Sequence, residues 1–275
     1  MISNLRLLPI VFGVALSTSA SADSTLEYVV NDAPNRPGKS QPLLIKNGLV
    51  MLKGAGGDSN TDMLYNRDNE SLLIIDHRKR SFMAVDQQQV SQIGQQAEQL
   101  QPLLQGFGEQ LGKLSPQQKA KWQQMLGGNV SIDDIAAAAA PAKEASVVKT
   151  GLGKNVAGIP CEQIDVLQGA NKTAELCVAD PSRLSLSSDD YDTVRSLLQF
   201  SESLASKTQG IASQFGFKIP RVQLHDLAGV PVEIKDYSSR HESSVVLSRI
   251  VSTELAPEML KVPNGYHRAP LTLWK

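Results

Sequence analysis

Residues 62–86, DMLYNRDNESLLIIDHRKRSFMAVD, contain three short apolar runs separated by two polar tetrapeptides. The runs are rich in residues that favour strands, whereas the tetrapeptides RDNE (67–70) and HRKR (77–80) have the polar composition of turns. We therefore predict an antiparallel β-meander with polar turns over this stretch.

The same pattern extends toward the N-terminus. The segments TLEYVV (25–30) and PLLIKNGLVMLKG (42–54) are again rich in β-branched and long apolar residues. Asn47-Gly48 divides the second segment, and this dipeptide is a strong signal for a tight hairpin turn. β structure is therefore predicted from residue 25 to residue 86.

A helical pattern begins at residue 87. Apolar side chains recur at steps of three and four over 90–114, although Pro102 and several glycines interrupt them, so we predict two helical pieces here. Another helix is predicted at 115–126, where Ser115 and Gln118 have the spacing of a capping box. The alanine run that follows is either helix or linker. We expect a helical insertion over about 87–145.

β structure is predicted again over 146–180, followed by a long helix within 184–215. Ser187 caps this helix near its start, with Asp189 and Asp190 in the first turn. Two more strands are predicted at 229–238 and 243–255. This order of elements indicates a single α+β domain over 23–275, in which helices are inserted into an antiparallel sheet.

The first 22 residues have the composition of a secretory signal peptide. A positively charged start is followed by a ten-residue apolar core at 7–16 and by a sequence ending Ala20-Ser21-Ala22. The core is about half the length that a membrane span needs. We predict cleavage after Ala22 and export, and no later stretch is long and apolar enough to span a bilayer.

The composition and net charge of the chain argue against nucleic-acid binding. The chain has 275 residues, of which 41% are hydrophobic and 20% charged, as in an ordinary globular protein. Lys plus Arg number 27 and Asp plus Glu number 28, a net charge of -1, and no basic run is present. Nucleic acid is therefore not expected among the partners.

Both cysteines, Cys161 and Cys177, fall within one predicted hairpin. A three-residue loop centred on Gly169 places them directly opposite each other on the polar face, with an apolar face behind. That apolar face comprises Ile164, Val166, Ala174, Leu176 and Val178. In an exported protein two such cysteines are expected to form a disulfide. Metal ligands, a redox pair and a cysteine nucleophile are weaker alternatives, because the hairpin has neither a C-x-x-C motif nor a histidine.

No segment has the pattern of an active site. His77 lies in a charged turn and is interpreted as a solvated surface residue, and the other three histidines are scattered. The glycine-rich stretches GAGGDSN (54–60) and GLGKN (151–155) lack the P-loop spacing and are interpreted as hairpin loops. A G-x-S-x-G elbow is also missing. We predict no catalytic residue, no metal site and no cofactor, and hence no enzyme.

Three pieces of the chain resemble a bacterial family of exported proteins, domain of unknown function 4412. They are residues 62–86, the stretch from VAGIPCEQIDVLQG (156–169) to the start of the long helix, and GVPVEIKDY (229–237) together with VPNGY (262–266). That family is similar to the LolA/LolB superfamily of periplasmic lipoprotein carriers. The resemblance implies a curved antiparallel sheet, a half-barrel that wraps an apolar cavity under helices.

Two functions are compatible with these features. The first is a soluble periplasmic protein that binds a lipid or another hydrophobic ligand in the half-barrel. The alternative is an envelope protein-protein interaction or regulatory module without enzymatic activity, which binds its partner through the helical segments at 87–140. The sequence identifies neither the ligand nor the partner.

Overall fold

The computed structural model describes residues 23–31, 37–55, 58–92, 95, 114–118, 121, 145–208, 227–238 and 242–270. The predicted signal peptide at 1–22 therefore lies outside the described residues. So do most of the predicted helical insertion at 87–145 and most of the predicted partner surface at 87–140.

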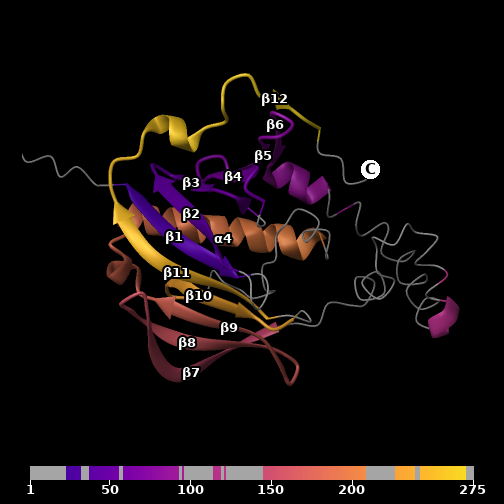
Figure 1. Ribbon diagram of the computed structural model, residues 1–275, viewed down its shortest axis with the longest axis vertical. Helices are drawn as coiled ribbons and strands as arrows, with labels where there is room; N and C mark the ends of the chain where they lie inside the picture. Colours follow the sequence, from indigo (N-terminus) through magenta and orange to yellow (C-terminus); the bar gives the residue numbers. More distant parts are fainter. Residues whose placement is uncertain are drawn as a thin grey trace, which may run out of the picture.

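The described strands form one large sheet, shown in Figure 1. Its order is β12-β6-β5-β4-β3-β2-β1-β11-β10-β9-β8-β7, and every neighbouring pair is antiparallel except the parallel pair of β12 and β6. The strands are β1 (Ser24–Asn31), β2 (Lys39–Lys46), β3 (Leu49–Leu52), β4 (Thr61–Asn66), β5 (Ser71–Asp76), β6 (Ser81–Val85), β7 (Ala145–Val156), β8 (Ile159–Gln168), β9 (Asn171–Ala179), β10 (Val230–Asp236), β11 (Ser243–Ser252) and β12 (His267–Arg268). The sheet is not closed into a barrel, and with its long helix it has the α+β character that the sequence predicts.

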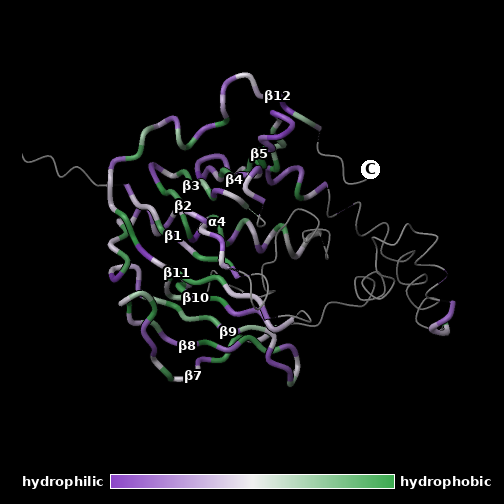
Figure 2. Tube along the Cα trace, in the orientation of Figure 1, coloured by the Kyte–Doolittle hydropathy of each residue, from purple (hydrophilic) through white to green (hydrophobic). Residues whose placement is uncertain are grey.

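The meander predicted from residue 25 to residue 86 is confirmed as β1 to β6. Asn47 and Gly48 both have positive φ, 50° and 74°, as a tight two-residue hairpin turn requires. The four-residue turns at 67–70 and 77–80 end in Glu70 and Arg80, which also adopt positive φ. In Figure 2 hydrophobic stretches run through the strands, and polar residues gather at many of the turns between them.

The long helix α4 (Ser188–Thr208) packs across one face of this meander. The Ser187 hydroxyl caps it by accepting a hydrogen bond from the Asp190 backbone N–H at 3.0 Å, so the predicted cap is confirmed. The Phe200 ring lies 5.5 Å from the Tyr65 ring, and Val194 and Leu204 are buried against the sheet. The helix was predicted within 184–215, and the residues of that range beyond 208 lie outside the described residues.

The opposite face of the meander is covered by the C-terminal segment, residues 253–268. This segment contains the 3-10 helix η5 (Pro257–Leu260) and ends in β12, as the yellow ribbon of Figure 1 shows. Leu255 and Leu260 from the segment are buried together with four meander residues, Leu44, Met51, Leu64 and Ile75. Burial on both faces explains why these strands are almost continuously apolar instead of alternating.

Helix caps at two further positions have the geometry that their sequences suggest. Ser115 and Gln118 exchange side-chain to backbone hydrogen bonds of 2.9 and 3.4 Å, which confirms the predicted capping box. Asp86 and Gln89 form a second reciprocal pair, with hydrogen bonds of 3.2 and 2.8 Å, where residues 87–92 begin a helix.

Candidate functional site

The structure brings Cys161 and Cys177 together, with their sulfur atoms 2.06 Å apart and their Cα atoms 5.4 Å apart. They are nevertheless not directly opposite each other, because Gln163 is the pairing partner of Cys177. The predicted register is therefore wrong by two positions. The turn at Gly169 has two residues instead of three, and a bulge between Val166 and Leu167 shifts the rest of the hairpin.

A shift of two positions keeps every side chain on its predicted face. The apolar face is buried, with Ile164, Val166, Ala174, Leu176 and Val178 forming a cluster with Leu227. Both cysteines are also buried, Cys177 completely, within the main core of the protein. Their neighbours on the polar face are charged.

Two lysines and three carboxylates form an ion network on this polar face. Lys172 Nζ lies 2.6 Å from Asp165 and 2.7 Å from Glu175, and Lys154 bridges Glu175 to Glu233. The hydrogen bond from Lys172 is the largest of the effects that hold the pKa of Glu175 below its ordinary value. Each carboxylate thus has a lysine partner, and the network ties β7, β8, β9 and β10 together.

A half-open pocket of about 1000 Å³ lies on the opposite, apolar face of β7, β8 and β9. Ile164, Val178 and Leu227 contribute apolar surface to it, and all three are otherwise buried in the cluster that Leu198 of α4 also contacts. Four charged residues line it as well, namely Lys149, Glu162, Asp180 and Arg183. Asp180 caps the 3-10 helix η2 (Pro181–Leu184) through a 2.8 Å hydrogen bond from the Ser182 N–H.

One wall of the pocket is a bulge in β7. The stretch GLGKN (151–155) was predicted as a hairpin loop, but it lies inside this strand. The pairing jumps between Lys149 and Gly153, and Gly151 has a φ of +72°. Thr150 closes the bulge, since its hydroxyl donates to the Gln163 carbonyl at 2.9 Å and accepts from the Leu152 N–H at 3.1 Å.

The bulge presents Leu152 to solvent with 60% of its surface exposed. Bulges commonly re-aim a side chain next to a binding site, and a large apolar side chain gains nothing from exposure by itself. Leu152 also lines the pocket, together with Gly151 and Gly153 on either side of it. The bulge is therefore the part of this pocket that sequence reasoning missed, because two glycines in five residues are typical of a loop.

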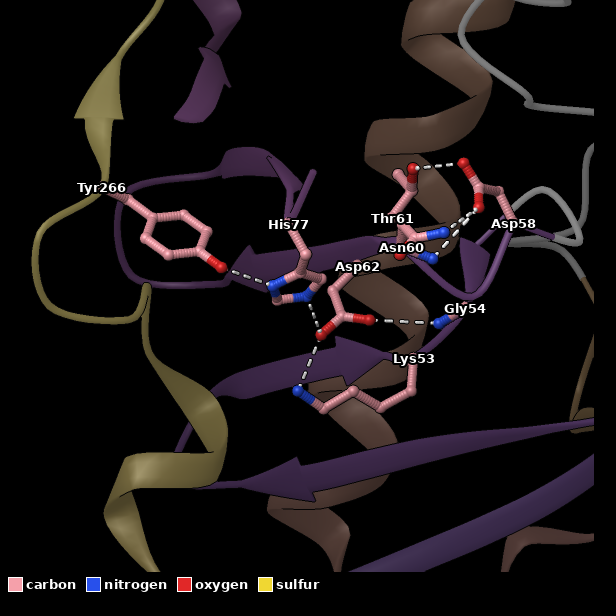
Figure 3. A network of polar contacts seen from close by, with 8 residues as sticks. All are labelled: Lys53, Gly54, Asp58, Asn60, Thr61, Asp62, His77 and Tyr266. Atoms are coloured by element: carbon pink, nitrogen blue, oxygen red, sulfur yellow. Dashed lines mark hydrogen bonds and ion pairs between the residues drawn. The ribbon is translucent and has the colours of Figure 1, made fainter. Parts of the chain in front are cut away.

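A second polar site lies between the meander and the C-terminal segment (Figure 3). The buried carboxylate of Asp62 accepts hydrogen bonds from Lys53 Nζ at 2.8 Å, from His77 Nε2 at 2.9 Å and from the Gly54 N–H at 3.1 Å. The other ring nitrogen of His77 lies 2.9 Å from the Tyr266 hydroxyl. The neutral histidine tautomer that satisfies both contacts donates from Nε2 to Asp62 and accepts from Tyr266.

His77 is therefore not the solvated surface residue that its charged turn suggested. Its partner Tyr266 lies 189 positions away, and no local pattern points to that contact. Burial acts to raise the pKa of Asp62, but hydrogen bonds from Lys53 and His77 outweigh it and hold the pKa below its ordinary value. None of these residues lines the pocket on β7, so the site's evident role is to fasten the C-terminal segment to the meander.

Substituting Asp62 by asparagine is expected to lower the free energy of unfolding at pH 7 by about 1.5–3 kcal/mol, because hydrogen bonds to a charged acceptor are lost. Since the pKa of Asp62 is lower in the folded chain, its carboxylate stabilises the fold above about pH 4, and the contribution disappears as the pH falls through the folded pKa. Urea unfolding at pH 7, 5 and 3 measures both effects, in each case against the wild-type chain.

The exposed carboxylate of Asp192 on α4 provides the control, since Asp192→Asn should change stability by less than about 0.5 kcal/mol. A difference between wild type and Asp62→Asn that stays constant down to pH 3 would contradict the assignment of the ionised carboxylate as the stabilising group.

Among the described residues, no group of three or more His, Cys, Asp or Glu side chains is arranged to hold a metal ion. None of the described helices is long and apolar enough to cross a membrane.

No family model matches the chain, and no curated protein matches it. Among solved structures it is similar to PNGF-II in a C2 crystal form, with a TM-score of 0.40 and 7% identity, and in a P21 crystal form, with a TM-score of 0.39 and 8% identity. The chain is covered to 90% in both cases but spans only 31% of the length of those chains.

Proposed function

We propose that this chain is a non-enzymatic periplasmic protein that binds a hydrophobic ligand, such as an acyl chain, in the pocket of β7, β8 and β9. The observation that carries the proposal is the pocket itself, about 1000 Å³ in volume, whose apolar surface continues into the buried cluster of Ile164, Val178 and Leu227. Small-molecule sites have this size and this mixture of apolar surface with a few charged groups. The export signal predicted at residues 1–22 supports the periplasmic location.

We also propose that the sheet has the half-barrel geometry expected of a LolA-like carrier. Three strands separate β7 from β11 in the sheet order, so a flat sheet would place them about 19 Å apart at about 4.8 Å per strand. Residues of β7 and β11 nevertheless lie within 8 Å of each other. Bulges in β7, β9, β10 and β11 are the usual means of bending a sheet in this way, and they support a curved wall around the apolar face.

A polar rim around an apolar floor suits an amphiphile better than a purely apolar molecule. Lys149 and Glu162 form an exposed ion pair of 3.2 Å at the rim, and such pairs open at little cost. Arg183 lines the same pocket and is exposed. An acyl chain lying along the floor would leave its polar head at this rim, in contact with water and with these charges.

Filling the pocket provides a direct test. Ala228 lines the pocket and is exposed, so Ala228→Trp adds a large side chain there without entering the core. We expect this variant to bind a fluorescent fatty acid at least about tenfold more weakly, a loss of about 1.4 kcal/mol. Native mass spectrometry of detergent-free protein, followed by solvent extraction, would identify the ligand carried from the cell.

The matched control is Ala256→Trp. Ala256 is also exposed but lies before η5 and does not line the pocket, so this variant should bind as the wild type does. Equal binding by both variants would place any ligand elsewhere, and a protein that neither carries nor takes up a lipid would refute the proposed function.

A further inference from the structure

Two arginines from distant parts of the sequence meet at the edge of the sheet where β12 lies beside β6 (Figure 1). β12 pairs in parallel with β6, which places Arg268 beside Phe82. Arg80 is the last residue of the turn before β6, and its backbone carbonyl accepts a hydrogen bond from the His267 N–H at 3.1 Å. Arg80 and Arg268 are therefore neighbours, and both are exposed. We call this pair of residues the basic corner.

The carboxylates in the turns around the basic corner already have positively charged partners. The three ion pairs are Asp58 with Arg78, Asp62 with Lys53 at 2.8 Å, and Asp76 with Lys79 at 3.2 Å. Within the described part of the chain, neither Arg80 nor Arg268 forms an ion pair. The basic corner therefore carries two surplus positive charges on a chain whose net charge is -1.

We propose that the basic corner docks on the surface of an anionic phospholipid bilayer, where Arg80 and Arg268 bind lipid phosphates. A guanidinium presents paired N–H donors whose geometry matches that of a phosphate group. Two such groups lie side by side on an exposed edge, and the nearby carboxylates are occupied by other cations. This arrangement suits a surface on which many phosphate groups are displayed.

The sequence that follows Arg268 favours a bilayer over an acidic protein as the partner. Residues 271–275 read LTLWK and lie outside the described residues. Leucine and tryptophan beside basic residues are typical of segments that bind at the boundary between lipid head groups and acyl chains. The proposed contact therefore includes residues 271–275 together with the basic corner.

The basic corner is separate from the ligand pocket. β12 begins the sheet order and β7 ends it, and neither Arg80 nor Arg268 lines the pocket. The inference therefore does not rest on the proposed ligand, and variants can test the two independently.

Flotation with vesicles tests the docking. The exported protein is used, with its mass showing that residues 1–22 are absent, because a retained leader would itself bind lipid. At low salt we expect the protein to float with vesicles of phosphatidylcholine containing about 30% phosphatidylglycerol, and not with phosphatidylcholine alone. Arg80→Gln and Arg268→Gln should each weaken binding about fivefold, and the double variant about 25-fold, since each basic residue near an anionic surface contributes about that factor.

A matched control changes the net charge by the same amount elsewhere. Arg195 on α4 and Arg249 on β11 are also exposed, so the double variant Arg195→Gln, Arg249→Gln should float as the wild type does. Ala228→Trp, which fills the ligand pocket, should float as well. This variant separates docking at the basic corner from uptake of a lipid by the pocket.

Tryptophan fluorescence tests whether residues 271–275 belong to the contact. The chain has two tryptophans, so Trp122→Phe leaves Trp274 as the only indole. Its emission should shift to shorter wavelength when the phosphatidylglycerol vesicles are added, because the indole enters a less polar environment. The shift should disappear when Arg80 and Arg268 are both replaced by glutamine.

Four outcomes would overturn the inference. Equal binding to vesicles with and without phosphatidylglycerol would exclude recognition of negative charge. Equal loss of flotation by the control and the Arg80→Gln, Arg268→Gln variant would trace binding to net charge instead of the basic corner. Flotation without a shift of Trp274 emission would contradict the contact at 271–275. A protein that floats with neither kind of vesicle does not dock on lipid, and this leaves the basic corner to an acidic protein partner.

Discussion

Replacing Phe200 by alanine is expected to lower the free energy of unfolding by about 3–5 kcal/mol, the range for removing a buried aromatic ring. Phe200 is only 2% exposed and lies at the centre of the contact between α4 and the meander, with its ring 5.5 Å from that of Tyr65. The Tyr65 hydroxyl is in turn 2.7 Å from the Ser196 hydroxyl, one turn earlier on the helix. Losing the ring leaves a cavity in the main core where the helix crosses the sheet.

Urea unfolding of Phe200→Ala and of Gln199→Ala measures this effect. Gln199 precedes Phe200 on α4 and is exposed, so its replacement should change stability by less than about 0.5 kcal/mol. A Phe200→Ala variant that loses less than about 1 kcal/mol would mean that α4 does not anchor this face of the sheet.

Replacing both cysteines by alanine is expected to lower the free energy of unfolding by about 3 kcal/mol. The two cysteines are 16 positions apart, and closing a loop of about that length removes conformational entropy from the unfolded chain and raises its free energy by roughly this much in the entropic model. Alanine keeps the site apolar, which matters because Cys161 and Cys177 are both buried in the main core. The hairpin itself should persist, since its other face is held by five buried apolar side chains.

Reductant provides the internal control for this prediction. Under reducing conditions that open the disulfide during unfolding, the wild type should lose stability, while the Cys161→Ala, Cys177→Ala double variant should unfold at the same urea concentration with and without reductant. Intact mass of the untreated protein should show two missing hydrogens. A wild type insensitive to reductant, with both hydrogens present, would contradict the predicted disulfide.

Local sequence was a reliable guide where short-range rules decide the conformation. Asn47-Gly48 forms its turn because these residues tolerate the positive φ that the turn demands. Ser115 and Ser187 cap helices because their side chains reach backbone N–H groups within one turn. In each case the interacting groups lie within a few residues of each other, so one short stretch of the sequence contains both partners.

Local sequence does not fix the pairing register of two strands. Alternation of polar and apolar residues fixes which face a side chain occupies, but it cannot distinguish two registers that differ by two positions. The hairpin of β8 and β9 shows this directly, since its faces are as predicted while Cys177 pairs with Gln163 instead of Cys161. The bulge near Leu167, which produces the shift, leaves no mark on the polar pattern.

The candidate site depended on contacts that no local pattern encodes. The pocket combines the β7 bulge with Ile164, Val178, Arg183 and Leu227, which come from separate parts of the chain. The contact of His77 is also long-range, because its partner Tyr266 lies 189 positions away in the sequence.

What the sequence by itself determined is therefore the meander of β1 to β6, the Asn47-Gly48 turn, the caps at Ser115 and Ser187, the two faces of the cysteine hairpin and the α+β composition. The tertiary structure alone decided that β1 lies between β2 and β11, that residues 253–268 cover the meander, and that the pocket opens beside β7. The physical reason is one of range. Turns and caps are stabilised within a few residues, whereas strand order and pocket walls follow from burying apolar surface contributed by distant segments.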